Sequence, residues 1–218
     1  MNLAPNADIA IAGGPGQGRA FSDQPARVVS AVKAYVSAYR QSKVVAAVGP
    51  LPGDGAASQD PIAGPAPVGL SLDELRKSDM SPFEAVASGD RAVPAIQMSN
   101  AIYAAYDSVT PATLLTDAVD ELRDRLGFEG AIVSADLVTT TAPTGGFCGG
   151  GRDRGAEGGC RPAGRAGRPR AAGEAYRAVV AAVRSRKISP ERVADALKRI
   201  AEVRALTRDS RDPLRPGE

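Results

Sequence analysis

The chain has 218 residues, enough for one sizeable hydrophobic core, and it carries a formal net charge of +2 with a pI near 8.6. Because the charge balance is mild, we expect neither nucleic acid nor a membrane as a partner. No apolar run approaches the roughly 18 residues that cross a bilayer, and the first residues lack a basic-then-apolar signal pattern. We therefore expect a cytoplasmic protein by default. A signal peptide lost together with an earlier segment of the chain would change this expectation.

The absence of histidine limits the chemistry of the chain. Its two cysteines, Cys148 and Cys160, stand in a Gly/Arg-rich stretch without CxxC spacing, so a Cys/His zinc site has no support. We expect no metal and no cofactor. Histidine is also the commonest general acid or base. A hydrolase built from this chain would have to work with carboxylates alone.

The first third of the chain alternates between predicted strands, loops and helices. An apolar strand is expected over residues 2–9, with Asp8 near its end, and the glycine-rich loop 13–18 has neither P-loop nor dinucleotide-binding spacing. Apolar residues at helical spacing predict a helix from about Ala26 to Arg40. A buried strand over 44–48 then leads into Gly49-Pro50-Leu51-Pro52-Gly53-Asp54-Gly55.

Loop 61–70 is rich in proline and glycine and is expected to be irregular. Ser71-Leu72-Asp73-Glu74 is a capping-box pattern for a short helix, and Pro82 indicates the first turn of the next helix, which stops at Gly89. A strand over 92–98 leads to Asn100. A helix over 114–126 stops at Gly127 and precedes a short apolar strand, 131–134, that is followed by Ala135 and Asp136.

Several of these segments, in this order, resemble glycoside hydrolase family 3, the β-N-acetylhexosaminidase and β-glucosidase group. Residues 127–137 are similar to its nucleophile strand, Gly-Phe-x-Gly leading to Ser-Asp-(Asp/Ala)-Leu. Residues 2–9 resemble Ala-Pro-Val-x-Asp, 19–25 resemble Arg-Ser-Phe-Gly-x-Asp-Pro, and 49–55 resemble Lys-His-Phe-Pro-Gly-His-Gly. The resemblance covers about residues 2–137 and resumes in a C-terminal helical pair near 174–204.

The resemblance implies an O-glycosyl hydrolase, a retaining β-glycosidase, on a (β/α)8 barrel. A complete barrel typically needs about 250 residues, and a core strand already begins at residue 2. We therefore predict an α/β fold, a partial (β/α)8 TIM barrel that lacks its first strands. The expected organisation is the C-terminal-side portion of the barrel over 1–146, a disordered or irregular Gly/Arg-rich insert over 147–173, the helical pair over 174–208 and a disordered tail over 209–218.

The resemblance also implies which residues meet the sugar. Three residues match family positions around the substrate: Arg19, Asp8 and Met98. Asn100 stands at a further such position, where the family has a His. The expected partner is a carbohydrate, an N-acetylglucosaminide or a glucoside. The catalytic positions depart from the family pattern: Ala135 stands where the nucleophilic Asp is expected, and Ile62 where the acid/base His is expected. Gly49 and Pro50 replace the Lys-His pair and have no side-chain donors for sugar hydroxyls.

Three carboxylates remain as candidate catalytic groups. Asp136 would serve as the nucleophile only if the strand end slipped by one residue, because successive strand side chains point to opposite faces. Asp60 is the remnant of an Asp that orients the lost His, and Asp54 replaces a second His. A turn or cap role is the favoured reading of each carboxylate. Loss of acid/base help alone costs roughly 10²–10⁴ in rate.

Three readings of function follow. The first is a truncated, catalytically impaired or non-functional gene fragment of the family, with little or no hydrolysis of β-N-acetylhexosaminides or β-glucosides. The second is a carbohydrate-binding pseudoenzyme. The third is a true glycosidase whose nucleophile is displaced to Asp136. Residues 147–170 add an open question: they are either a flexible basic loop able to touch phosphates, or a stretch read out of frame. Back-translation with GC-rich codons, shifted by one base, gives a helix and strand that look like the family's Ala-Gly-Ala-Asp element, and the gene's DNA tests this.

Overall fold

The computed structural model describes residues 1–137, 160–161 and 169–209. Most of the insert predicted over 147–173, and the tail at 210–218, lie outside these residues. The helices and strands are α1 (Pro25–Gln41), β1 (Ala47–Leu51), β2 (Pro67–Val68), α2 (Leu72–Lys77), α3 (Ser81–Ala87), β3 (Ala95–Met98), β4 (Ile102–Tyr103), α4 (Thr116–Asp120), β5 (Ala131–Val133), β6 (Cys160–Arg161), α7 (Pro169–Arg184) and α8 (Pro190–Asp209).

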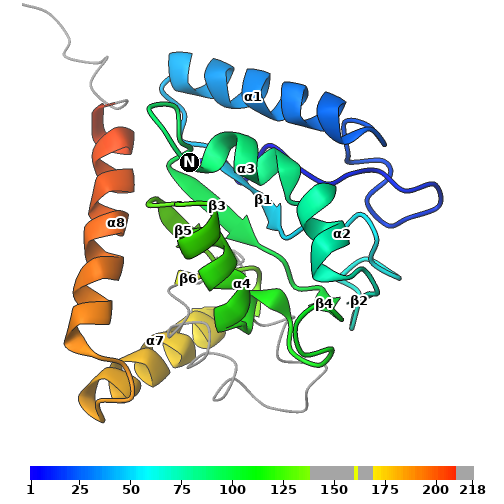
Figure 1. The fold of residues 1–218 in the computed structure, drawn as a ribbon. Coiled ribbons are helices and arrows are strands. Elements are labelled where there is room, and N and C mark those ends of the chain that lie inside the picture. The colour runs from blue at the N-terminus through cyan, green and yellow to red at the C-terminus, as the bar shows by residue number, and fades with distance from the viewer. Residues whose placement is uncertain (138–159, 162–168, 210–218) are drawn as a thin grey trace, which may run out of the picture.

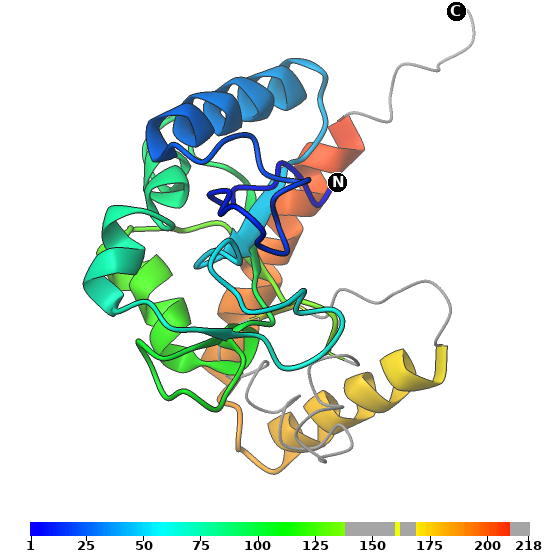
Figure 2. The same ribbon diagram turned by 90° about the vertical axis from the view of Figure 1, so that its right-hand side faces the viewer.

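The main sheet is parallel throughout, in the order β1-β3-β5-β6. Parallel neighbours need a crossover, and the chain supplies helices α2 and α3 between β1 and β3, and α4 between β3 and β5. Helices α1, α3 and α4 cover one side of the sheet, and α8 lies along its β5 end (Figure 1, Figure 2). The repeated strand–helix–strand pattern is that of a parallel barrel wall, as predicted.

The core fills the space between the sheet and its helices. On α1, Val28, Val32 and Val36 point inward, as the helical spacing predicted. The largest fully buried side chains include Tyr103, Phe83 and Phe128. Strand β1 reads Ala-Val-Gly-Pro-Leu with four of five positions buried, which is typical of a strand covered on both faces. Within the described part of the chain, no helix combines the length and apolarity needed to span a bilayer.

The regular strand predicted over residues 2–9 is wrong. The segment makes only two isolated parallel bridges to the β1 region, Asn2 with Ala46 and Asn6 with Gly49. Between them Pro5 has no backbone N–H to donate, so the ladder is interrupted there. The segment still lies beside β1, because the Ala7 N–H donates to the Gly49 carbonyl over 2.8 Å.

Two predictions about helices turn out differently. The capping box is confirmed: Ser71 Oγ accepts from the Glu74 N–H over 3.3 Å, and Glu74 Oε2 accepts from the Ser71 N–H over 2.8 Å. The single helix over 114–126 is wrong, because Leu115 is extended and separates a 3₁₀ turn from α4. A π-helical turn, Glu121–Arg125, follows α4 directly.

Other boundaries also move. The strand predicted over 44–48 is β1 at Ala47–Leu51, because the Val44 N–H closes the end of α1 on the Tyr39 carbonyl. The loop 61–70 contains β2, which pairs with β4 in a small parallel sheet. The insert predicted to be irregular supplies β6, paired with β5, and α7 begins at Pro169 inside it. Strand β6 forms by backbone pairing with β5. Its sequence lacks the apolar pattern from which a strand is predicted, so the sequence analysis did not find it.

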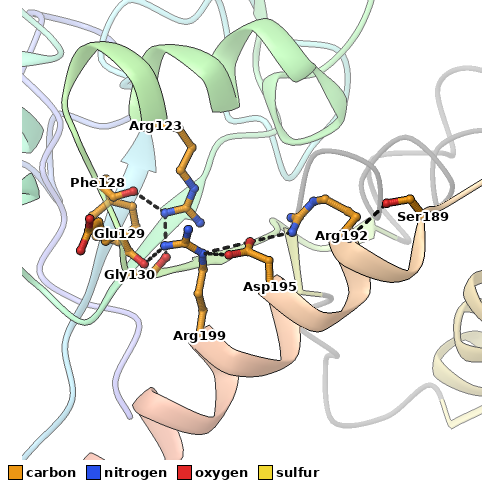
Figure 3. A network of polar contacts seen from close by, with 8 residues as sticks. All are labelled: Arg123, Phe128, Glu129, Gly130, Ser189, Arg192, Asp195 and Arg199. Carbon is orange, nitrogen blue, oxygen red and sulfur yellow. Dashed lines mark hydrogen bonds and ion pairs between the residues drawn. The ribbon is translucent and has the colours of Figure 1, made fainter.

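Two arginines hold the loop before β5 from two sides, Arg123 from the π-helical turn and Arg199 from α8 (Figure 3). Arg123 donates to the carbonyls of Phe128 and Gly130, the latter over 2.8 Å, and Arg199 donates to the carbonyl between them, that of Glu129. On α8 itself, Asp195 accepts from Arg199 over 3.0 Å. These contacts fix the entry to β5, and therefore the place where β5 delivers the residues that follow it.

Candidate active site

A pocket of about 430 Å³ opens where the parallel strands end, within the size range usual for small-molecule sites. Asp54 lies three residues after β1, Ser99 and Asn100 directly follow β3, and Ala135 and Asp136 follow β5. The C-terminal edge of a parallel barrel is where active sites form. The lining is Leu3, Asn6, Asp8, Arg19, Pro50, Asp54, Asp60, Pro61, Ile62, Gln97, Met98, Ser99, Asn100, Ala135 and Asp136.

Two buried carboxylates meet at the floor of this pocket. Asp8 is fully buried and Asp54 is 7% exposed. The backbone N–H of Asp54 donates to Asp8 Oδ1 over 2.7 Å, and Asn6 Nδ2 donates to Asp8 Oδ2 over 2.8 Å. Burial raises the pKa of Asp8 above its ordinary value, although these two hydrogen bonds act against the shift.

Asp54 is held from the opposite side by β3 and β4. Ser99 Oγ and the Tyr103 hydroxyl both donate to Asp54 Oδ1, the latter over 3.2 Å. Burial first, and the nearby negative charge of Asp8 second, raise the pKa of Asp54 to about 7. At neutral pH this carboxyl is therefore poised between its acid and its base form, the state required of a proton donor.

The glycines of the loop after β1 are fixed by close approach of other backbone. A Cβ on Gly55 would lie 2.0 Å from the carbonyl oxygen of Ile9. Gly53 has φ +134°, and its Cβ would lie 2.9 Å from Asp79 Cβ. Only glycine fits at either position, which explains why this chain keeps Gly53 and Gly55 of the family motif while the side chains around them differ.

Arg19 and Asp60 form the rim. Arg19 comes from the loop before α1, and its guanidinium contacts Asp60 Oδ2 at 3.2 Å. Asp60 Oδ1 accepts from the backbone N–H of Ile62 over 2.9 Å, so Asp60 shapes its own turn. The Ile62 side chain, 54% exposed, stands in the lining where the resemblance expects a histidine, and it has no proton to give.

The end of β5 presents a methyl group to the pocket. Ala135 is 7% exposed, and its backbone N–H donates to Thr113 Oγ1 over 3.0 Å. The next carbonyl, that of Asp136, accepts from Asn100 Nδ2 over 3.2 Å. These two bonds anchor the strand end to the segments that follow β3 and β4, and together they specify the register that places Ala135 here.

Every residue that the sequence singled out lines this one pocket: Asp8, Arg19, Asp54, Asp60, Met98, Asn100 and Asp136. The sequence analysis did not predict three polar lining residues, Asn6, Gln97 and Ser99. Ser99 directly follows a predicted strand, and this position alone could have marked it as a site residue. No described residues gather three or more His, Cys, Asp or Glu side chains in a group suited to a metal ion. The polar groups that line the pocket are four carboxyl groups, one guanidinium, three side-chain amides and the Ser99 hydroxyl.

A parallel α/β wall with a carboxylate-lined pocket at its C-terminal edge defines a barrel-type enzyme scaffold. Comparison with known proteins gives the family. A model of the glycosyl hydrolase family 3 N terminal domain matches residues 1–203, so the chain belongs to that family, and the predicted fold class is confirmed with it.

The relatives are longer than this chain. A β-hexosaminidase of Xanthomonas campestris pv. campestris is 31% identical over 151 residues, which are 68% of this chain and 45% of that protein. The structure of a family 3 β-N-acetylglucosaminidase from Paenibacillus sp. superposes with a TM-score of 0.86 at 24% identity, over 100% of this chain and 42% of that one. The structure of a family 3 member from Mycobacterium smegmatis superposes with a TM-score of 0.80 at 23% identity, over 92% of this chain and 64% of that one. This chain therefore spans less than two thirds of each.

Proposed function

We propose that this chain binds a β-N-acetylhexosaminide or a β-glucoside in the pocket and hydrolyses its glycosidic bond very slowly or not at all. One observation carries the proposal: the strand end that delivers the family's attacking carboxylate delivers the Ala135 methyl group instead. A methyl group forms no bond to an anomeric carbon, so a retaining double displacement has no first step.

The loss of the acid/base acts in the same direction. Ile62 stands at that position, and acid/base help is worth roughly 10²–10⁴ in rate. Part of the sugar-binding side of the pocket remains. Arg19, Asn100 and Asp8 provide donors and acceptors around a pocket of suitable size, and two of the named relatives are a β-hexosaminidase and a β-N-acetylglucosaminidase. Sugar recognition without turnover is the function that this arrangement supports.

The test combines turnover with binding. The purified chain is incubated with nitrophenyl N-acetyl-β-glucosaminide and nitrophenyl β-glucoside, and the binding of the corresponding methyl glycosides is measured by calorimetry. We expect saturable binding of at least one methyl glycoside and no release of nitrophenol above a denatured control. Turnover that Asp136→Asn abolishes would establish Asp136 as a displaced nucleophile and overturn the proposal. Absence of binding by a folded sample would also overturn it.

A further inference from the structure

The pocket holds more carboxylates than cations. Asp8, Asp54, Asp60 and Asp136 line it together with one arginine, Arg19. Arg19 is paired with Asp60 at 3.2 Å. Asp8 and Asp54 receive only neutral donors, and within the described chain neither forms an ion pair. Buried carboxylates without a cation are costly, so this floor favours a positively charged guest.

One oxygen is left open to that guest. Both side-chain donors to Asp54, from Ser99 and Tyr103, reach Oδ1. No described residue donates to Asp54 Oδ2, although the side chain lines the cavity and is 93% shielded from solvent (7% exposed). The geometry therefore holds one carboxylate oxygen rigidly and leaves its twin as an acceptor with no donor in the described protein.

We propose that the pocket selects a hexosamine whose amino group is free and protonated, with the ammonium bound by Asp54 Oδ2 and Asp8 supplying the second negative charge. This inference rests on the proposed function, because the sugar occupies the same pocket, and it changes the substrate class from an N-acetylated or neutral sugar to a cationic one. A hydrogen bond from an ammonium to a carboxylate is roughly twice as strong as one between neutral groups.

The charges around Asp54 are consistent with a cation. The titratable and charged groups that face it are Asp8 and Arg19 from the first segment and Tyr103 from β4. With Asp60, three carboxyl groups stand against the single guanidinium of Arg19, so the pocket becomes more negative as Asp8 and Asp54 lose their protons. An acetamide in place of the ammonium carries no charge that could balance them.

The wild-type protein decides between a cationic and a neutral sugar. Calorimetry at pH 7 and low salt compares methyl β-glucosaminide with methyl N-acetyl-β-glucosaminide and methyl β-glucoside. We expect at least tenfold tighter binding of the glucosaminide. Equal or tighter binding of either neutral sugar overturns this inference and leaves the proposed function standing. Failure of all three to bind overturns the proposed function itself.

The pH dependence separates the two roles of Asp54. A cation requires the ionised carboxylate, so glucosaminide affinity should fall about tenfold between pH 7 and pH 5.5, as the carboxyl takes up its proton. A neutral sugar that accepts a hydrogen bond from the protonated acid would bind more tightly over the same interval. A flat or inverted dependence for the glucosaminide contradicts the inference without any variant.

Asp54→Asn gives the residue-level test. It should abolish the preference for the glucosaminide, so that the variant binds all three methyl glycosides with affinities within about threefold of one another. The matched control is Asp73→Asn, which removes the same charge from an exposed position on α2 and should keep the preference. If the Asp54→Asn protein folds and still prefers the glucosaminide, Asp54 is not the group that binds the ammonium. If the variant does not fold, the comparison of the three sugars with wild-type protein decides whether the pocket prefers a cation.

Discussion

The backbone N–H of Asp54 donates to the buried carboxylate of Asp8 over 2.7 Å, joining two loops that lie 46 residues apart. The bond fixes the loop after β1 onto the N-terminal segment at the base of the pocket. Asp8 is fully buried, and it is also held by Asn6. The position of Asp54, and with it the position of the open carboxylate oxygen Oδ2, therefore depends on Asp8.

Tyr103→Phe should loosen this arrangement. The Tyr103 hydroxyl lies 2.9 Å from the Gly53 carbonyl and 3.2 Å from Asp54 Oδ1, both buried, and its removal leaves an acceptor unpaired. We expect the free energy of unfolding to fall by about 1–2 kcal/mol in urea titrations. Tyr106→Phe is the control, because the buried Tyr106 hydroxyl has no partner among the described residues, and its loss should be nearly neutral. Equal effects of the two variants would contradict the assigned role.

Stability should decrease as pH rises. Burial raises the pKa of Asp54 to about 7 and that of Asp79 to about 6, and it raises the pKa of Asp8 as well. Between about pH 4 and pH 7 the unfolded chain releases these protons while the folded chain retains them, so unfolding becomes easier over that interval and levels off above it. Melting temperatures measured by circular dichroism should be higher at pH 5 than at pH 8.

Asp79→Asn isolates one contributor to this dependence. Asp79 Oδ1 is buried without a partner in the described chain, so ionisation there is costly. The variant should match wild type near pH 3.5, where the carboxyl is largely protonated in both the folded and the unfolded chain, and be more stable at pH 8 by roughly 1–3 kcal/mol. Asp73→Asn, on an exposed site, should show no such divergence. A variant with the same pH profile as wild type would exclude Asp79 as a contributor.

The sequence predicted what depends on local pattern. The valines of α1 and the Ser71–Glu74 capping box formed as their spacing required. The site residues converged because residues that follow parallel strands share one edge, and strand order alone brings Asp54, Asn100 and Asp136 together.

What escaped prediction depends on contacts distant in sequence. Gly55 is required by the carbonyl of Ile9, 46 residues earlier, and the pKa of Asp54 is raised by its burial and by the charge of Asp8, also 46 residues earlier. Periodicity does not reveal either relationship. The π-helical turn at Glu121–Arg125 was missed for a similar reason, because Arg76 and Arg125 both bind Glu121 there, and one of them lies on another helix.

Arg123→Met should destabilise the protein. Arg123 donates to the carbonyls of Phe128 and Gly130 and lies 5.2 Å from the centre of the Phe128 ring (Figure 3). Hydrogen bonds from a charged group are worth about 1.5–3 kcal/mol, so we expect a loss of about 2 kcal/mol in urea denaturation. Arg192→Met removes an ion pair to Asp195 between neighbouring turns of α8, and should cost about 0.5 kcal/mol or less. Similar losses in both would contradict a special role for Arg123.

Ala135→Asp combined with Ile62→His should create turnover. The Ala135 side chain lines the pocket at the end of β5, and Ile62 lines it from the loop after β1, so the pair restores an attacking carboxylate and an acid/base. We expect nitrophenyl N-acetyl-β-glucosaminide to be cleaved at least about 10²-fold faster than by wild type, the lower end of what acid/base help contributes. Ala135→Asp alone should gain much less, because the leaving oxygen still lacks a proton donor at residue 62. The matched control, Ala135→Asn with Ile62→His, has nearly the same shape but no nucleophile. If the double variant folds, binds the glycoside and is no faster than this control, the Ala135 methyl group is not what silences the site.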